Sequence, residues 1–347
     1  MKVDNIVVIH KRKKEKMIKV AINGFGRIGR LAFREMIQEK DFQIVAINDL
    51  TEAEDLAYLL KYDTNHRTLD KEISYEKNTI IYENKKIPVF QETDPSNLPW
   101  KELEVDLVIE STGLFTSEEK AYKHIEAGAK KVLISAPGKG NMKTIVYNVN
   151  DTILDGSEKI ISAASCTTNC LAPVLNILEQ EYGIKKGFMS TVHAYTNDQA
   201  TLDIAHKKGY KSRRGRACAQ NIVPSSTGAA KAIGEVIPSL KGKLDGIAYR
   251  VPVSDGSMID VTLELKRNTT KEEINQLIEK NQNETLKITY DPIVSSDIIG
   301  KKVGATVDAE LTNIIESDGT QLVKIVAWYD NETGYTAQMI RTAKKLF

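Results

Sequence analysis

A glycine-rich turn near the start of the chain has the spacing of a dinucleotide-binding site. Gly24-Phe25-Gly26-Arg27-Ile28-Gly29 follows the apolar run IKVAIN and opens a stretch with helical spacing, and Asp49 ends the next apolar run. In this setting Gly24 permits a tight turn, Gly26 lets the backbone approach a pyrophosphate, and Gly29 allows close helix–strand packing. Helix-terminal amides would then face the phosphates, and Asp49 would accept from the adenosine ribose. The pattern favours NAD, since Asp49 repels a 2′-phosphate; the alternative is a glycine turn with a capping aspartate.

A second segment, Ser165-Cys166-Thr167-Thr168-Asn169-Cys170, can supply a nucleophile. Apolar residues with helical spacing follow it, so Cys166 is expected near a helix N-terminus, where the dipole favours a thiolate and lowers the thiol pKa from about 8.5. Pro173 argues against a continuous helix, because its missing N–H in the second turn costs roughly 3 kcal/mol. Cys170 is expected to be packed. The alternative for Cys166 is a buried structural cysteine.

A cysteine nucleophile needs a base, and His193 is the best candidate among the five histidines. It lies in STVHAYTND, on an alternating strand with polar neighbours. The base of such a pair is usually distant in sequence from the cysteine. The other histidines fall in the N-terminal segment, in loop-like segments and on a helix of surface type: His10, His66, His206 and His124.

Arginine is scarce and clustered. The chain has 11 arginines against 37 lysines, and four of the 11 fall between residues 213 and 250. A planar guanidinium is preferred where phosphate or carboxylate must be held. The cluster therefore indicates either phosphate recognition or salt bridges at an interface. Its members are Arg213, Arg214, Arg216 and Arg250.

Composition excludes several classes of protein. The chain has 347 residues, with 48 Lys+Arg against 47 Asp+Glu and a net charge of +1. The protein therefore lacks a strong overall electrostatic field that would attract nucleic acid or an anionic membrane. Three cysteines make neither a disulfide framework nor a structural zinc site. No apolar run reaches the roughly 18 residues of a spanning helix. We expect a cytoplasmic α/β enzyme with no metal, nucleic-acid or membrane partner.

The pattern of elements predicts two domains after a tail. Residues 1–16 read as a disordered or foreign basic tail. Residues 17–165 alternate short apolar strands with helices, which predicts a Rossmann-type doubly wound NAD-binding domain. Residues 166–331 carry longer alternating strands and a charged amphipathic helix, which predicts an α+β catalytic domain with a mixed or antiparallel sheet. A last helix, about 332–347, is expected to pack back on the first domain.

Several long segments carry a resemblance to a known family. SCTTNCLAPV, STVHAYTNDQ, SSTGAAKAIG, GKLDGIAYRVPV and WYDNETGY occur in this order, and AINGFGRIGR and AINDLT precede them. Together they closely resemble the signature segments of phosphorylating glyceraldehyde-3-phosphate dehydrogenase, from about residue 17 to the end. The resemblance implies a glycolytic or gluconeogenic oxidoreductase that uses NAD and acts as a homotetramer.

The resemblance also assigns roles to individual residues. It implies Cys166 as the nucleophile, His193 as its base and Asn331 as the residue that orients the nicotinamide amide. Thr196 and Arg250 match positions that hold the substrate phosphate. Positions around the attacking inorganic phosphate are matched by Ser165, Thr167, Arg214, Thr227 and Gly228. Positions of the cofactor cleft are matched, beside the three glycines of the turn, by Arg27, Ile28, Asp49, Thr112 and Ser135.

The implied chemistry is the oxidation of glyceraldehyde 3-phosphate to 1,3-bisphosphoglycerate. Thiolate attack gives a hemithioacetal, hydride transfer gives a thioester, and inorganic phosphate releases an acyl phosphate. Two alternatives stay open. One is erythrose-4-phosphate dehydrogenase, against which SSTGAAKA argues. The other is a regulatory or moonlighting binding protein on the same fold.

The chain departs from the family pattern next to the cofactor region. Ile204-Ala205 stands where Leu-Pro is usual, and the following loop carries two extra residues. The smaller, less rigid Ala205 leaves the extent of NADP use open. We expect NAD to be the working cofactor, because the charge of Asp49 is retained.

Overall fold

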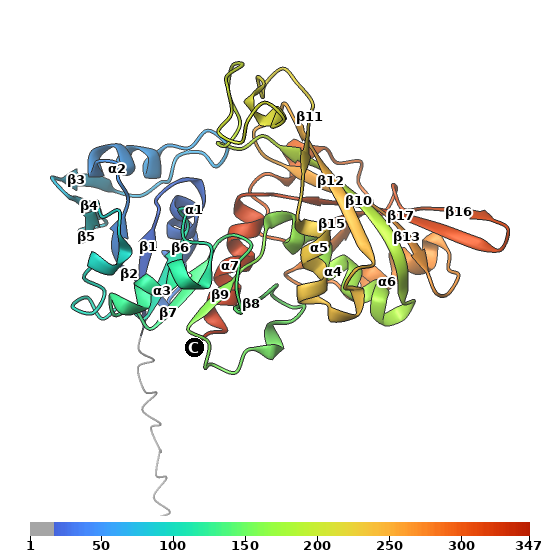
Figure 1. Ribbon diagram of the computed structural model, residues 1–347, viewed down its shortest axis with the longest axis horizontal. Coiled ribbons are helices and arrows are strands. Elements are labelled where there is room, and N and C mark those ends of the chain that lie inside the picture. The colour runs from blue at the N-terminus through green and yellow to red at the C-terminus, as the bar shows by residue number, and fades with distance from the viewer. Residues whose placement is uncertain (1–16) are drawn as a thin grey trace, which may run out of the picture.

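The structure is a computed structural model that describes residues 17–347; the expected tail of residues 1–16 lies outside the described residues. Two β-sheets lie side by side, and the C-terminal helix runs between them (Figure 1). The first sheet is built from the N-terminal half of the chain and the second from the C-terminal half.

The first sheet has nine strands in the order β3-β4-β5-β2-β1-β6-β7-β9-β8. Its central strand, β1 (Ile18–Asn23), pairs in parallel with β2 (Phe42–Asn48) on one side and β6 (Leu107–Glu110) on the other. The β3–β4 and β4–β5 pairs are antiparallel. The remaining strands are β3 (Ile73–Glu76), β4 (Thr79–Tyr82), β5 (Lys85–Phe90), β7 (Lys131–Ile134), β8 (Lys143–Thr144) and β9 (Ile160–Ser162).

Helices cover both faces of this sheet. α1 (Arg27–Met36), α2 (Ala53–Lys61) and α3 (Glu118–Glu126) follow β1, β2 and β6. Val20 and Ile22 belong to the core shared with α1, whereas Ala21 belongs to the core shared with α3. Burial on both faces explains why β1 reads as a continuous apolar run. The strand order reverses at β1, and the crevice beyond the carboxyl ends of β1 and β6 is where doubly wound sheets bind ligands.

The second sheet has eight strands and is mixed, as the sequence predicts. Its order is β11-β12-β10-β13-β17-β15-β14, and β16 pairs with β17. The β10–β12 and β14–β15 pairs are parallel, and the others are antiparallel. The strands are β10 (Ile184–Ala194), β11 (Val223–Ser226), β12 (Leu244–Val251), β13 (Ser257–Leu265), β14 (Leu286–Thr289), β15 (Ala305–Asp308), β16 (Asn313–Ser317) and β17 (Thr320–Tyr329).

One face of the second sheet packs on helices α4 (Cys166–Glu181), α5 (Ala229–Val236) and α6 (Lys271–Lys280). β13 shows the alternation clearly: Ile259, Val261 and Leu263 are buried in this core, and the residues between them are half-exposed. The opposite face, within residues 17–347, carries exposed apolar side chains, among them Phe188 on β10.

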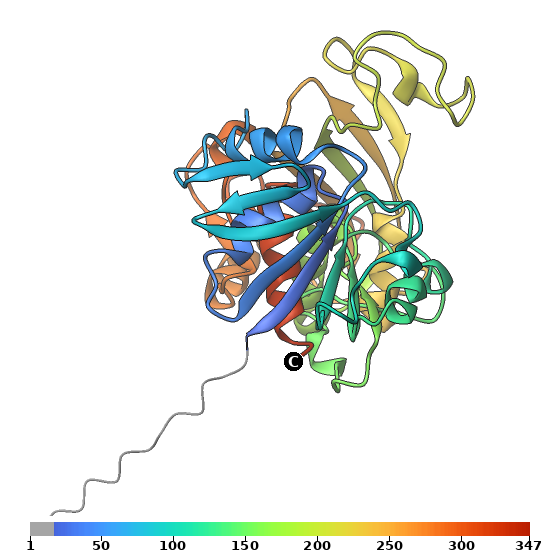
Figure 2. The same cartoon turned by 90° about the vertical axis from the view of Figure 1, so that its left-hand side faces the viewer.

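The last helix, α7 (Thr333–Lys344), joins the two halves. Tyr335, Met339 and Ile340 are buried in the core of the first sheet. Figure 2 looks onto the first sheet and shows α7 behind its strands. The chain therefore returns to the first sheet after completing the second one. In the part of the chain that the structure describes, no helix is long and apolar enough to cross a membrane.

Candidate active site

The glycine turn forms a cradle at the carboxyl end of β1. Gly24 has φ +89°, which L side chains rarely adopt. A Cβ on Gly29 would lie 2.1 Å from the carbonyl oxygen of Gly24, so only glycine allows α1 to pack this close to the turn. A Cβ on Gly26 would meet nothing within 4 Å, and Gly26 is exposed. Open space at this position fits a ligand that approaches the backbone.

The start of α1 has amides available for an anion. Gly26 caps the helix without a side-chain hydrogen bond. The first N–H groups of a helix have no partner within it, and the dipole favours a negative group there. Asp49 is tied to this turn, because its Oδ2 accepts from the N–H of Phe25 at 2.7 Å and its Oδ1 from that of Thr51 at 3.0 Å. The half-buried carboxylate keeps further lone pairs for a diol.

Arg27 and Asn331 lie at the junction of the two sheets. The Arg27 guanidinium forms ion pairs with Asp63 and Glu332. Asn331 is buried, and its Oδ1 accepts from Ser257 Oγ at 2.6 Å. Both residues line the central cleft. Arg27 therefore acts here as a bridge between the halves of the molecule.

Cys166 is the first residue of α4, and this helix continues through Pro173. Ser165 caps it: its Oγ accepts from the N–H of Thr168 at 3.1 Å. The preceding residue, Ala164, is buried and has φ +59°. A non-glycine residue in this region costs of order 1–3 kcal/mol and is often found at functional sites. The strained turn aims Cys166 out of the helix terminus toward β10.

Cys166 and His193 meet across the cleft, with Cys166 Sγ 3.4 Å from His193 Nε2. His193 Nδ1 lies 2.7 Å from the carbonyl oxygen of Ala194, to which it donates in the tautomer with hydrogen on Nδ1. In that tautomer Nε2 keeps a lone pair toward the sulfur. Arg250 Nη1 donates to the same carbonyl at 3.0 Å and lies 2.8 Å from Nδ1. Burial and the nearby Arg250 charge lower the pKa of His193 to about 3.

The expected lowering of the Cys166 pKa by the helix terminus is wrong for this structure. Burial raises the pKa of the Cys166 thiol, and this outweighs the opposing effects of Arg250 and of hydrogen bonds from Thr167. The sulfur keeps partial access to the cleft. Cys166 and His193 therefore rest as a neutral thiol and a neutral imidazole at neutral pH.

The candidate anion-binding residues fall into two groups. Arg250 reaches toward Thr196, with Nη1 3.4 Å from the Thr196 hydroxyl. Arg214 forms an ion pair with Asp198, whose other oxygen accepts from the Thr196 hydroxyl. These residues lie on adjacent segments beside His193.

The other four candidates sit at helix starts, and Ser165 is the cap of α4 described above. Thr227 and Gly228 precede α5, and Thr227 Oγ1 accepts from the N–H of Ala229 at 3.2 Å. Thr167 turns its hydroxyl inward to Tyr329 Oη at 2.8 Å, so only its backbone faces the helix terminus. For Thr167, any anion contact would come through the main chain.

A cleft of about 690 Å³ joins both halves of the molecule. Its walls include the candidates Arg27, Ile28, Thr112, Ser135, Ser165, Cys166, His193, Thr196, Arg250 and Asn331. The candidates outside these walls are Gly24, Gly26, Gly29, Asp49, Thr167, Arg214, Thr227 and Gly228. Arg214 instead faces a separate hollow beside β11, together with Lys208 and Lys211.

Sequence reasoning missed Tyr329, which lies beside the site, and misplaced His124. Tyr329 lies beneath the pair, with its ring edge-on to His193 and its hydroxyl hydrogen-bonded to Thr167 and Thr191. The only signal for it was an aromatic residue at the end of a buried strand. The placement of His124 on a surface helix is wrong: it is fully buried and bonded to Trp100 Nε1 at 3.0 Å.

Comparison with known proteins identifies the family. The model for the NAD binding domain of glyceraldehyde 3-phosphate dehydrogenase matches residues 18–118, and the model for its C-terminal domain matches residues 165–331. The chain belongs to the glyceraldehyde-3-phosphate dehydrogenase family. It is 55% identical over 326 residues to the glyceraldehyde-3-phosphate dehydrogenase of Clostridium pasteurianum, covering 94% of this chain and 97% of the relative. Identity is 53% to that of Clostridium acetobutylicum and 51% to that of Streptococcus pyogenes, with the same coverage.

The two family models match the two halves of the cleft. The NAD binding domain model covers the glycine cradle and Asp49. The C-terminal domain model covers Cys166, His193 and Arg250. The cleft thus joins a dinucleotide-binding half to a half that carries a thiol, an imidazole and a guanidinium.

Proposed function

We propose that this protein oxidises D-glyceraldehyde 3-phosphate, with NAD and inorganic phosphate, to 1,3-bisphosphoglycerate, as a glycolytic and gluconeogenic oxidoreductase. The observation that carries the proposal is the 3.4 Å contact of Cys166 Sγ with His193 Nε2, beside Arg250, in a cleft that Arg27 and Ile28 of the glycine-rich turn also line. A thiol, a base, an anion-binding group and a dinucleotide site are the four parts that this reaction needs.

NAD fits the residues of the first half. The open space at Gly26, the free amides of α1 and the Asp49 carboxylate suit a pyrophosphate and a ribose diol. Thr112 and Ser135 line the cleft together with Asn331 from the other half, and these residues would hold the nicotinamide end. When bound, NAD supplies the hydride acceptor for the oxidation.

Cys166 is the nucleophile and His193 its base. The neutral thiol gives its proton to Nε2 as the sulfur attacks the aldehyde carbon, and the hemithioacetal oxygen develops negative charge. The N–H at the start of α4 and the protonated His193 stabilise that oxygen. His193 returns this proton to the oxygen, which gives the hemithioacetal hydroxyl, and its Nε2 takes the proton back as the carbon gives up its hydride; a thioester remains on Cys166.

Arg250 couples substrate binding to the base. Its charge lies 2.8 Å from His193 Nδ1 and disfavours the imidazolium. A substrate phosphate on Arg250 and Thr196 balances that charge, so His193 becomes a stronger base when the aldehyde is bound. Inorganic phosphate, held near Arg214 and the start of α5, then attacks the thioester carbon and releases Cys166.

Matched cysteine variants test this function. Cys166→Ser should fold and bind NAD yet lose dehydrogenase activity by several orders of magnitude, because a hydroxyl is a far weaker nucleophile than a thiolate. Cys170→Ser is the control: Cys170 is buried and its thiol lies 3.8 Å from the carbonyl oxygen of Ala327, so a serine keeps a partner. It should retain most activity.

The assay follows NADH formation from glyceraldehyde 3-phosphate with and without inorganic phosphate. Equal loss in both variants, or a preference for erythrose 4-phosphate without need of phosphate, would contradict the proposal.

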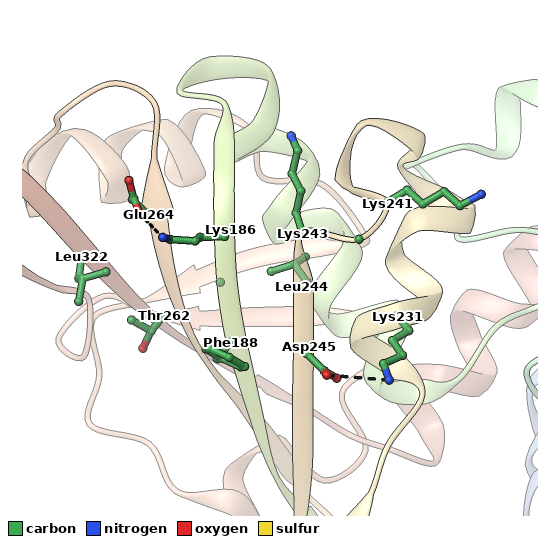
Figure 3. A pocket seen from close by; sticks show the side chains of 12 residues that line it. Lys186, Phe188, Lys231, Lys241, Lys243, Leu244, Asp245, Thr262, Glu264 and Leu322 are labelled. Carbon is green, nitrogen blue, oxygen red and sulfur yellow. Dashed lines mark ion pairs between the residues drawn. The ribbon is translucent and has the colours of Figure 1, made fainter.

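The uncovered face of the second sheet supports a homotetramer. Phe188 is 73% exposed, Leu322 46% and Ile247 37%, on β10, β17 and β12. Figure 3 shows Phe188 and Leu322 on this face, with Lys186 paired to Glu264. Exposed apolar patches rimmed by charge are typical of interfaces. A second copy buries this face through a two-fold axis, and a further axis completes the tetramer.

The proposal also covers the domain limits and the cellular location of the protein. Residues 17–165, with α7, form the NAD-binding domain and residues 166–331 the catalytic domain. Small-molecule substrates are the partners. Free rather than bridged cysteines at 166, 170 and 218 suit the reducing cytoplasm.

A further inference from the structure

A group of acidic side chains lies beneath the cleft, at the junction of the two halves. Asp255 precedes β13, and Asp330 and Glu332 lie between β17 and α7. His66 reaches them from the loop after α2, with Nε2 3.4 Å from Asp255 Oδ2 and 2.9 Å from Glu332 Oε2. Asp255 and Asp330 are 2% and 1% exposed. Buried carboxylates need donors or cations, because water cannot solvate them.

Within this group, the nearby basic side chains make their closest contacts with Glu332. Arg27 pairs with Asp63 and Glu332. His66 Nε2 donates to Glu332 and its Nδ1 lies 3.1 Å from Thr333 Oγ1. Glu332 therefore stays ionised. Burial by itself would raise its pKa, but the pairing with Arg27 and His66 outweighs burial and lowers the pKa to about 2.

Asp330 and Asp255 differ in the donors that reach them. Asp330 accepts from three backbone N–H groups, those of Gly300, Glu332 and Thr333, at 2.7–2.8 Å. Asp255 accepts one such bond, from Gly256 at 2.8 Å, and among residues 17–347 its Oδ2 accepts none, because His66 Nε2, 3.4 Å away, donates to Glu332 instead. The carboxyl groups of Asp255 and Asp330 interact, and the pKa of each is raised, so a hydrogen bond between them requires a proton on one of them. The donor count places that proton on Asp255.

Burial, together with the charges of Asp330 and Glu332, raises the pKa of Asp255 to about 9. The direction agrees with the donor count. A carboxyl group kept neutral in this way acts as a hydrogen-bond donor at neutral pH.

We propose that Asp255 is a positioning residue that remains protonated and donates to Asp330, and thereby fixes the turn Asp330–Glu332 that presents Asn331 to the cleft. The role of Asn331 toward the nicotinamide rests on the proposed function. The same turn that carries Asp255 also carries Ser257, whose hydroxyl donates to Asn331 at 2.6 Å. Asp255 and Ser257, at the start of β13, thus hold the neighbouring residues Asp330 and Asn331.

A bound cation is the competing explanation. His66, Asp255 and Glu332 offer ligand atoms within 4.8 Å of one another. Glu332 Oε2, however, already accepts from Arg27 and His66, and a metal would need the His66 Nε2 lone pair that this donation excludes. A proton on Asp255 satisfies the group without breaking these bonds.

The test compares an amide with a truncation at this position. Asp255→Asn keeps a donor toward Asp330, so its dissociation constant for NAD, measured by titration calorimetry at pH 7.5, should stay within about threefold of the unmodified enzyme. Asp255→Ala removes the donor and should weaken NAD about tenfold or more, the effect of losing one buried hydrogen bond. Asp308→Asn is the control, because Asp308 is also buried with one oxygen lacking a donor, but lies on β15 away from the cleft walls.

Infrared spectroscopy supplies a readout independent of turnover. The unmodified protein without NAD should show the carbonyl stretch of a protonated carboxylic acid at pH 7, and Asp255→Asn should lack it while Asp308→Asn keeps it. Three results would overturn the proposal: no such band, equal loss of NAD affinity in Asp255→Asn and Asp255→Ala, or a divalent ion bound stoichiometrically in the unmodified protein and lost in Asp255→Ala. A protein without dehydrogenase activity that still shows the band would refute the proposed function alone.

Discussion

At the scale of single residues, the resting Cys166–His193 pair is uncharged. Both groups lose stabilising water, and Arg250 opposes a positive charge on His193. The thiolate is the reactive form of a cysteine, so an uncharged thiol is the less easily oxidised state. In the proposed mechanism, a substrate phosphate at Arg250 makes His193 a stronger base.

The lowered pKa of His193 predicts a pH dependence of stability. The histidine is neutral in the folded protein down to about pH 3 but takes a proton near pH 6.5 in the unfolded chain, so the free energy of unfolding falls as pH drops through that window. The slope is at most about 1.4 kcal/mol per pH unit. His193→Asn should remove it and gain about 2 kcal/mol relative to the unmodified protein between pH 7.5 and pH 5. Urea unfolding at both pH values checks this, and parallel pH profiles would show that His193 is not the group responsible.

At the scale of elements, the six residues of the turn between β1 and α1 include one glycine required for packing and another that leaves room for a ligand. Gly29 serves packing, since a Cβ there would lie 2.1 Å from Gly24 O, whereas Gly26 faces open space. Glycine is thus needed at two positions of one motif for two different physical reasons.

Two glycine variants should separate these reasons. Gly29→Ala should cost about 1–3 kcal/mol of folding free energy through overpacking. Gly26→Ala should leave stability nearly unchanged and weaken NAD about tenfold, because the methyl group occupies space that the pyrophosphate needs. Urea denaturation and titration calorimetry measure the two effects. Loss of stability in Gly26→Ala, with Gly29→Ala unaffected, would reverse the assignment.

At the scale of the whole molecule, residues 17–347 cover the second sheet on one face only. α4, α5 and α6 bury the inner face, while Phe188, Ile247 and Leu322 stay exposed on the outer one. In the proposed homotetramer, a second copy of the chain covers this face.

Phe188→Lys should shift the protein to a smaller species in sedimentation velocity, because two-fold contact would bury an unpaired charge from each copy. Tyr122→Lys is the control: Tyr122 is an exposed aromatic residue on α3, beside the first sheet. It should leave the assembly unchanged. An unmodified protein that sediments as a monomer, or a Phe188→Lys variant that keeps its size, would contradict the homotetramer.

The sequence by itself determined the fold class, the glycine cradle with Asp49, and the candidate pair Cys166 and His193. These signals are local, since strand and helix periodicity and the spacing of glycines depend on near neighbours in the chain. Tertiary structure alone decided the rest: the raised pKa of Cys166, the contact of Arg250 with His193, the burial of His124 and the meeting of His66, Asp255, Asp330 and Glu332. Each depends on burial or on side chains from distant segments, and the free energy of a charge is set by its surroundings in space rather than by its neighbours in sequence.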